Sequence, residues 1–143
     1  MSGQAVAGFE LFAVTADQGI RAWGQTLPEL FRQAARGLFS LIVEAGTVEN
    51  REWVPVSATA GDRETLLVAW LNELLYLYET RALVMGEWRI RRLEDTALEA
   101  EAGGEAVDAA RHALLGHVKA VTYHGLALYP TERGWEARVV VDV

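Results

Sequence analysis

Two carboxyl groups adjoin each other at the end of the sequence and could bind a metal ion. Strand alternation in the closing stretch WEARVVVDV places Asp142 on the polar face of a strand, and the carboxylate of Val143 follows directly. Two adjacent carboxylates repel each other unless a cation binds both. Oxygen ligands of this kind are preferred by Ca²⁺, Mg²⁺ and Mn²⁺. Asp17, in the expected first turn, supplies a third carboxylate if the last strand pairs beside the first.

These residues also have a purely structural interpretation. Aspartate is a common turn former, and Asp142 can be an exposed residue at a strand end. Nothing local in the sequence brings Asp17 and Asp142 together, so the metal site depends on how the strands pair.

The stretch VKAVTYHGL contains a second pair of candidate residues. Lys119 is the single lysine in the chain, and the other cationic residues are arginines. Arginine does not replace lysine where a compact point charge is needed, although a solvated lysine on an edge strand is an equally simple explanation. In a regular strand Lys119 faces the same way as Val121, Tyr123 and Tyr129, and His124 faces the other way. A bulge would change this.

Length and composition exclude several classes of protein. A chain of 143 residues is expected to form one domain with its own core. Because there is no cysteine, disulfides and thiolate zinc sites are excluded, and a cytoplasmic location is expected. The longest uncharged apolar run, LLVAWLN, is too short to span a membrane, and the first residues lack the features of a signal peptide.

The net charge of −7 disfavours direct, tight binding to nucleic acid, which depends on cationic side chains. The longest basic run is RIRR, at residues 89–92. A protein partner or a hard cation fits this charge better.

The motifs of several enzyme classes are missing from the sequence. There is no glycine-rich phosphate loop, G-x-S-x-G elbow, H-E-x-x-H or G-x-G-x-x-G. His112 and His117 are poorly spaced for zinc and are expected to be surface or loop histidines.

The expected elements begin with two short strands within FELFAVTADQGIRAWG, joined by a turn at 17–19. A capping box from Thr26 to Glu29, in which each side chain accepts from the other residue's amide, starts a first helix. Asp62 caps a second helix. The remaining expected strands cover 53–60, 87–92, 97–102, 118–129 and 135–143, with a turn at Gly103-Gly104.

This order of elements does not alternate as in a doubly wound fold. It predicts the α+β class: residues 1–143 form a single two-layer domain, in which a mostly antiparallel β-sheet carries two helices on one face.

Four stretches, in the same order along the chain, resemble the archease family. They are TADQGIRAWGQTLPELFRQAARGLF, LLVAWLNELLYLYETR, VKAVTYHGL and the closing VVVDV. The strings WLNELLY and VKAVTYH are specific, and T-A-D-x-G-I supports them. The resemblance covers nearly the whole chain.

The resemblance implies a small β-sheet protein backed by two helices that is not an enzyme in its own right. Archeases assist the RtcB-type RNA ligase, which joins RNA ends carrying a 2′,3′-cyclic phosphate or 3′-phosphate to 5′-hydroxyl ends, as in tRNA splicing. They promote guanylylation of the ligase by GTP with Mn²⁺ and allow multiple turnover. The expected partner is therefore such a ligase, and tRNA or other RNA is contacted only through it.

The resemblance also assigns roles to individual residues. Asp17, Asp142 and Val143 match the family's metal ligands, and the expected ion is Ca²⁺, with Mg²⁺ or Mn²⁺ as alternatives. Lys119 and His124 match the lysine and histidine of its V-K-A-V-T-Y-H string and are expected to act in ligase activation. No catalytic residue is expected. Lys119 is either a charge for a partner's phosphate or a counter-ion to the two aspartates.

The sequence departs from the family pattern at two positions. Val14 replaces the histidine that usually precedes T-A-D, and His117 replaces a residue that is often acidic. The loss of a polar group near Asp17 is expected to weaken the metal site or to mark an altered partner.

Two other functions are compatible with the sequence. Asp17, Asp142 and Lys119 could serve a metal-dependent hydrolase or nucleotidyl-transfer enzyme, although no general base or phosphate cradle accompanies them. A protein or RNA chaperone that acts through a surface patch is the other alternative.

Overall fold

The computed structural model describes residues 6–143, which form seven strands and two α-helices. In chain order these are β1 (Gly8–Val14), β2 (Asp17–Gly24), α1 (Leu27–Ser40), β3 (Glu52–Thr59), α2 (Arg63–Arg81), β4 (Leu83–Leu93), β5 (Ala97–Ala106), β6 (Ala120–Thr131) and β7 (Gly134–Asp142).

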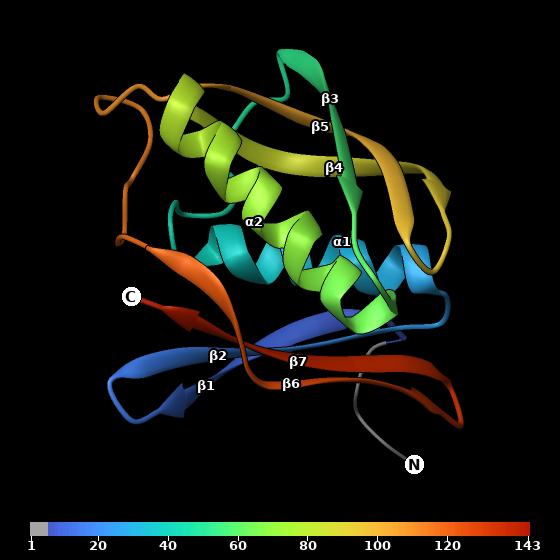
Figure 1. Ribbon diagram of the computed structural model, residues 1–143. Helices are drawn as coiled ribbons and strands as arrows, with labels where there is room; N and C mark the ends of the chain where they lie inside the picture. Colours follow the sequence, from blue (N-terminus) through green and yellow to red (C-terminus); the bar gives the residue numbers. More distant parts are fainter. Residues whose placement is uncertain (1–5) are drawn as a thin grey trace.

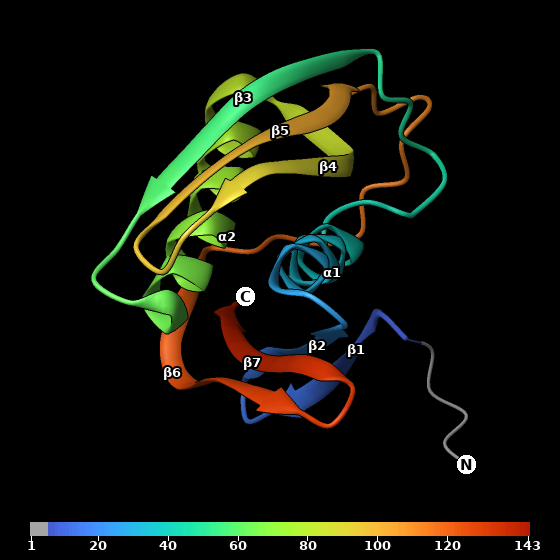
Figure 2. The ribbon, with the colours of Figure 1, turned by 90° about the vertical axis from the view of Figure 1, so that its right-hand side faces the viewer.

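The strands form two antiparallel sheets with the helices between them (Figures 1 and 2). One sheet has the order β1-β2-β7-β6, and the other has the order β3-β5-β4. Helix α1 packs on β2 and on β4, and α2 packs on β6 and on β3, so each helix contacts both sheets. The predicted α+β class is confirmed, but the strands form two sheets rather than the single sheet that was expected.

The apolar core fills the space between the sheets and the helices. Its largest fully buried side chains include Trp70, Phe31, Ile20, Leu30, Leu38, Leu71 and Leu74. Full burial of one large apolar side chain contributes about 1.5–3 kcal/mol. The buried indole Nε1–H of Trp70 donates to the carbonyl oxygen of Phe31 at 3.0 Å, which joins the two helices directly.

Both predicted helix caps are present. The Thr26 hydroxyl accepts from the Glu29 amide at 3.3 Å, but the Glu29 carboxylate accepts from the Gln25 amide rather than from that of Thr26. Asp62 caps α2 in a complete box, because its carboxylate accepts from the Thr65 amide and the Thr65 hydroxyl accepts from the Asp62 amide.

The first turn lies two residues before its predicted position. Val14 pairs with Asp17, so the turn consists of Thr15 and Ala16, with Ala16 at φ 63°, and residues 17–19 belong to β2. Gly19 is needed there for a different reason: a Cβ at this position would lie 2.2 Å from the ring of Phe12.

The predicted turn at Gly103-Gly104 is also wrong, because both glycines lie inside β5. A Cβ on Gly104 would lie 2.0 Å from the carbonyl oxygen of Val84, and one on Gly103 would meet the ring of Trp53 at 2.8 Å. These glycines permit close approach within the three-stranded sheet.

The connection from β5 to β6 is held by Glu105, whose side chain is 4 % exposed. Its carboxylate pairs with Arg111, accepts from the Glu49 amide at 2.6 Å and lies 3.0 Å from Nε2 of His112. The Asp108 amide donates to Nδ1 of His112, so Nε2 carries the proton and donates to Glu105. The Arg111 guanidinium, followed by the Glu49 amide, lowers the pKa of Glu105 to about 2.

Glu105 is expected to make folding stability sensitive to acid. Its pKa is lowered in the folded protein, so its contribution is complete above its ordinary pKa of 4.5 and is lost as the pH falls toward about 2. The free energy of unfolding can be measured with urea at about pH 5 and at about pH 3. It should fall less between these two pH values for Glu105→Gln than for wild type. An equal loss in both proteins would contradict this role.

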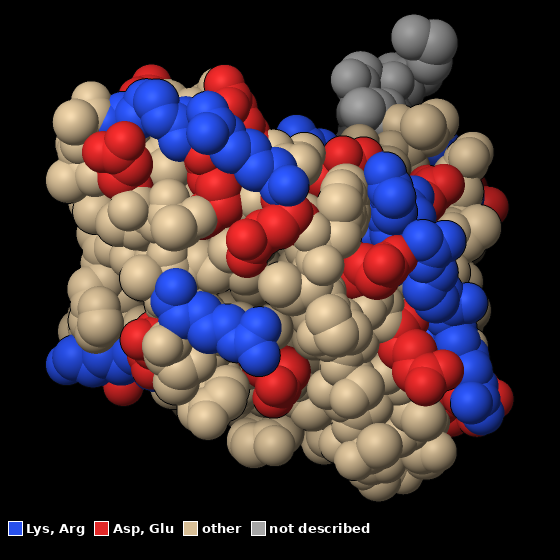
Figure 3. Space-filling view, turned by 90° about the horizontal axis from the view of Figure 1, so that it is seen from above, with Lys and Arg blue, Asp and Glu red and all other residues tan. Residues whose placement is uncertain are grey.

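Two of the three arginines in the RIRR run pair with carboxylates, and the third, Arg89, lies over the ring of Trp53. Arg91 Nε donates to Glu101 at 2.7 Å, and Arg92 Nε donates to Glu94 at 2.9 Å. Figure 3 shows basic and acidic side chains interleaved on this side of the molecule.

In the described part of the chain, neither helix has the length and apolarity needed to cross a membrane.

Candidate functional site

Strand pairing brings the two ends of the proposed metal site together. In the four-stranded sheet Gln18 pairs with Val141, so the next step of the same register sets Asp17 beside Asp142. Asp142 in turn pairs with Ala120 on β6, and Asp17 pairs with Val14 on β1. Directly opposed residues of neighbouring strands have Cβ atoms about 4.5–5.5 Å apart. The turn of β1–β2 and the end of β7 lie on the same side of the molecule in Figure 1.

These residues lie on the sheet face that points away from the helices. Ile20 and Val139, which pair with each other, are fully buried on the helix side. Asp17 and Asp142 are each three residues away along their strands, so alternation turns their side chains to the opposite face. We call this set of cross-strand neighbours, Val14, Asp17, Asp142 and Ala120, the carboxylate row.

Neither aspartate forms a salt bridge with a cationic side chain of the described residues. No salt bridge involves Asp17 or Asp142 within residues 6–143, and Asp142 is exposed while Asp17 is partly exposed. Two uncompensated carboxylates on one row fit the oxygen preference of a hard cation. In the same range, no three His, Asp or Glu side chains gather as a metal site.

Lys119 lies directly beside the row. Its main-chain N–H donates to the carbonyl oxygen of Asp142 at 2.8 Å, and its side chain is exposed. The sequence predicted that Lys119 lies inside a strand, but β6 begins one residue later, at Ala120. The structure thus brings together Asp17, Lys119 and Asp142, which are far apart in the sequence.

A wide bulge in β6 contains His124. Thr122 pairs with Val140 and Ala127 pairs with Arg138, so residues 123–126 oppose the single residue between these partners on β7. The exposed His124 donates its main-chain N–H to the Thr122 hydroxyl at 3.3 Å, and Gly125 has φ 65°. The bulge packs against Val140, since a Cβ on Gly125 would lie 3.8 Å from it.

The bulge overturns the alternation expected for a regular strand. Val121 pairs with the buried Val141 on the helix side, whereas Tyr129 pairs with Glu136 on the open side. Residues before and after the bulge therefore do not continue one alternation. Val140, against which the bulge packs, is two residues from Asp142, so the bulge lies next to the carboxylate row.

Asn72 on α2 fixes the start of β6, a role that the sequence pattern did not predict. Its Nδ2 donates to the carbonyl oxygen of Val121 at 3.0 Å, and its Oδ1 accepts from the Val121 amide at 2.9 Å. The only signal is a polar side chain at the boundary of an apolar stripe, between Leu71 and Leu74. Asn72 thereby positions the backbone two residues after Lys119.

Replacing Asn72 by alanine should cost about 1–3 kcal/mol of unfolding free energy, because it leaves a partly buried N–H and C=O of Val121 without partners. Urea denaturation measures this directly. Glu79→Ala, an exposed change on the same helix, should alter the free energy by less than about 0.5 kcal/mol. A similar, small effect of both changes would show that the Asn72 contacts are unimportant.

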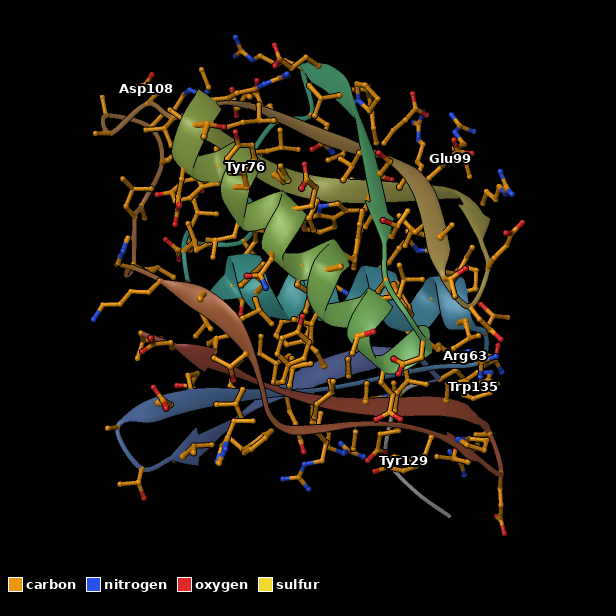
Figure 4. All side chains as sticks on the ribbon, viewed as in Figure 1. Arg63, Tyr76, Glu99, Asp108, Tyr129 and Trp135 are labelled. Atoms are coloured by element: carbon orange, nitrogen blue, oxygen red, sulfur yellow. The ribbon has the colours of Figure 1, made fainter. Side chains whose placement is uncertain are left out.

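The rest of the open face carries a charge network. Arg21 lies between Glu10 and Glu136, at 3.1 Å and 3.0 Å, and Tyr129 donates its hydroxyl to Glu136. Tyr129 points away from the helices in Figure 4. The hydrogen bond to Glu136 raises the pKa of Tyr129. This network lies on the same face of the sheet as the carboxylate row.

The other two histidines do not form a metal site. His112 lies in the β5–β6 connection, as predicted, but it is buried at 3 % exposure and bonded to Glu105 rather than lying at the surface. His117 is exposed in the same connection.

Comparison with known proteins identifies the family. The family model described as the archease protein family matches residues 9–143, which include every residue of the carboxylate row, Lys119 and His124. The chain belongs to the archease family.

Individual archeases agree with this membership. Protein archease of Methanosarcina acetivorans is 38% identical over 139 residues, covering 94% of this chain and 95% of the relative. Protein archease of Thermococcus gammatolerans is 39% identical over 140 residues, covering 94% and 98%. The solution structure of protein 1598 of Methanobacterium thermoautotrophicum superposes with a TM-score of 0.80 at 35% identity, covering 95% of this chain and 99% of that one.

Val14 lies next to the proposed metal ligands. This residue, where the resemblance implies a histidine, is the cross-strand partner of Asp17 and a member of the carboxylate row. An apolar side chain therefore lies directly beside one of the proposed metal ligands.

Proposed function

We propose that this archease activates an RtcB-type RNA ligase by promoting its GTP-dependent guanylylation and turnover, and that it uses a divalent cation to do so. The observation that carries the proposal is the carboxylate row with Lys119 beside it. Residues from three separate archease-like strings lie side by side at one end of the four-stranded sheet. Such a cluster can be presented to a partner without any movement of the fold.

The carboxylates of Asp17 and Asp142, with the terminal carboxylate of Val143, would hold the cation, and Ca²⁺, Mg²⁺ or Mn²⁺ suits these oxygen ligands. When bound, the ion supplies positive charge next to the partner's nucleotide or metal centre. The chain's own residues do the rest: the aspartates orient the ion at an exposed sheet edge, and the β-pairing of β2 with β7 fixes their spacing.

Lys119 would supply a second positive charge at the same edge. Its exposed ammonium can donate to a phosphate oxygen of the ligase-bound nucleotide. His124, held in the bulge beside the row, is the second side chain that we assign to ligase contact. RNA would then be reached only through the ligase.

Lys119→Ala tests the proposal. Because the side chain is exposed, the melting temperature should stay within a few degrees, as for a surface change below about 0.5 kcal/mol. Guanylylation of the ligase by GTP should slow about fivefold, the effect of losing one contact worth about 1 kcal/mol. Arg133→Ala, an exposed cation in the β6–β7 turn, is the matched control and should leave activation unchanged.

The same assay separates activation from catalysis. The archease alone, incubated with GTP or RNA and a divalent metal, should show no turnover. Turnover without the ligase would favour a metal-dependent enzyme. If Lys119→Ala activates the ligase normally, Lys119 is only a solvated residue at the strand end.

A further inference from the structure

We propose that the side chains of Leu114, Leu115 and Tyr123 dock this archease on the ligase, next to Lys119 and the carboxylate row. We call these three residues the docking patch. The inference rests on the proposed activation of an RtcB-type ligase, and it adds the surface by which the two proteins recognise each other. The matching surface of the ligase is expected to be apolar with an acidic border.

The docking patch consists of large apolar side chains that are open to solvent. Leu114, Leu115 and Tyr123 are 46 %, 58 % and 64 % exposed, and Tyr123 is the most exposed large hydrophobic residue within residues 6–143. Single exposed apolar residues are common on soluble proteins, whereas several near one another mark a surface that binds another molecule. The position of the three residues therefore decides whether they form such a surface.

All three residues lie near Lys119. Leu115 precedes Lys119 by four residues, which is at most about 14 Å of extended chain. Tyr123 lies in the bulge, three residues after Ala120, the partner of Asp142, so its backbone is within about 10 Å of the carboxylate row along the strand. In Figure 1 the connection to β6, the start of β6 and the C-terminus lie at the same end of the molecule. A protein that covers the docking patch would also meet Lys119 and the row.

The backbone that carries the two leucines is fixed before any partner binds. The N–H of Leu115 donates to the carbonyl oxygen of Ile42 at 2.9 Å, and the N–H of Glu44 donates to that of Ala113 at 2.9 Å. These bonds join the connection to the segment that follows α1. A preorganised surface of this kind binds without the cost of ordering a loop.

The charge around the docking patch favours an acidic partner surface. Residues 109–131 contain none of the chain's 20 acidic residues, although they contain its single lysine and all three histidines. In this segment Arg111 and His112 are paired with Glu105, whereas His117 and His124 are exposed like Lys119. Because no negative charge comes from this segment, acidic residues on the partner are favoured over basic ones.

A protein surface fits the docking patch better than RNA does. Single-stranded RNA is bound by stacking of its bases on aromatic rings or guanidinium planes, and its phosphates require several cationic side chains. Leucine offers no stacking plane, and the segment has one exposed lysine in a chain of net charge −7. Apolar side chains with a polar border are instead typical of a protein–protein contact.

Titration of the ligase with the archease separates docking from activation. For Leu115→Ser and for Tyr123→Ser, the archease concentration that gives half-maximal guanylylation should rise at least about fivefold. Direct binding to the immobilised ligase, measured by biolayer interferometry, should weaken by a similar factor. At saturating archease both variants should reach the wild-type rate. Lys119→Ala should instead lower the saturating rate and change the half-maximal concentration less than about twofold.

Leu11→Ser is the matched control. Leu11 is 41 % exposed and lies on β1, at the opposite edge of the four-stranded sheet from β6, so this variant should bind and activate as wild type does. All the serine variants change exposed side chains, and their melting temperatures should stay within a few degrees of wild type. Wild-type affinity of either Leu115→Ser or Tyr123→Ser overturns the docking patch, and so does an equal loss in Leu11→Ser.

The two measurements also separate this inference from the proposed function. If wild type binds the ligase without activating it, the proposed function is wrong, while weaker binding by the two variants still supports the docking patch. If wild type does not bind the ligase, both are overturned. Binding of a single-stranded RNA oligonucleotide that weakens in Leu115→Ser would make the patch an RNA surface and would equally overturn docking on a protein.

Discussion

Asp17→Ala is expected to lower the affinity for Ca²⁺ or Mn²⁺ by at least about tenfold, or about 1.4 kcal/mol. The change removes one of the two side-chain carboxylates of the row, so the site loses both an oxygen ligand and half of its side-chain charge. The fold should remain intact because Asp17 is partly exposed and makes no salt bridge in the described residues.

Calorimetric titration of Asp17→Ala and Glu132→Ala with CaCl₂ or MnCl₂ measures this effect. Each variant changes the net charge from −7 to −6, but the exposed Glu132 lies in the β6–β7 turn, at the other end of the sheet. Equal affinities for the two variants would mean that only the overall charge matters and that Asp17 is not a ligand.

Val14→His is expected to raise the metal affinity that Asp17→Ala lowers, and the same titration measures it. An imidazole in this position would lie across from Asp17, on the same face and row. Mn²⁺ accepts imidazole readily, whereas Ca²⁺ prefers oxygen, so the affinity for Mn²⁺ should rise more than that for Ca²⁺. Val14→Leu is the control for size. If the ratio of the two affinities did not change, position 14 would lie outside the metal's coordination sphere.

Much of the sheet face could be predicted from alternation alone. In β7 the expected inward residues Ala137, Val139 and Val141 are buried, and Arg138 and Asp142 face outward. The wide bulge of β6 could not be predicted, because its cause is not local. Val140 on the open face is only 5 % exposed, and a Cβ on Gly125 in the bulge would lie 3.8 Å from it.

The proximity of Asp17 and Asp142 also depends on contacts between distant parts of the chain. It requires β7 to insert beside β2 in the order β1-β2-β7-β6, and the pattern within each strand is the same for any order. The resemblance to archeases supplied what alternation could not, because it placed both aspartates in one proposed site.

The wrong turn predictions have a common physical origin. Glycine marks a position where a side chain does not fit, and turns are only one such position. Gly19 lies under the ring of Phe12, and Gly103 lies against the ring of Trp53. In both cases the aromatic side chain, distant in sequence or on another strand, is what excludes a Cβ.

An uncharged extension after Val143 is expected to lower metal affinity at least about tenfold and to reduce ligase activation with it. The extension converts the terminal carboxylate into a neutral amide and adds bulk next to Asp142. Folding should survive, because Val143 is 46 % exposed and lies beyond β7, while the buried Val139 and Val141 are unchanged.

The matched protein carries the same extension before Met1, where the whole of β1 separates it from Asp17. Calcium or manganese titration and ligase guanylylation, measured on both proteins, should show a loss only for the C-terminal extension. If the two proteins behave alike in both measurements, Val143 is not a ligand. The cation would then have to be held by Asp17 and Asp142 with water alone, and a site of two side-chain carboxylates is expected to bind Ca²⁺ only weakly, because affinity rises with ligand charge.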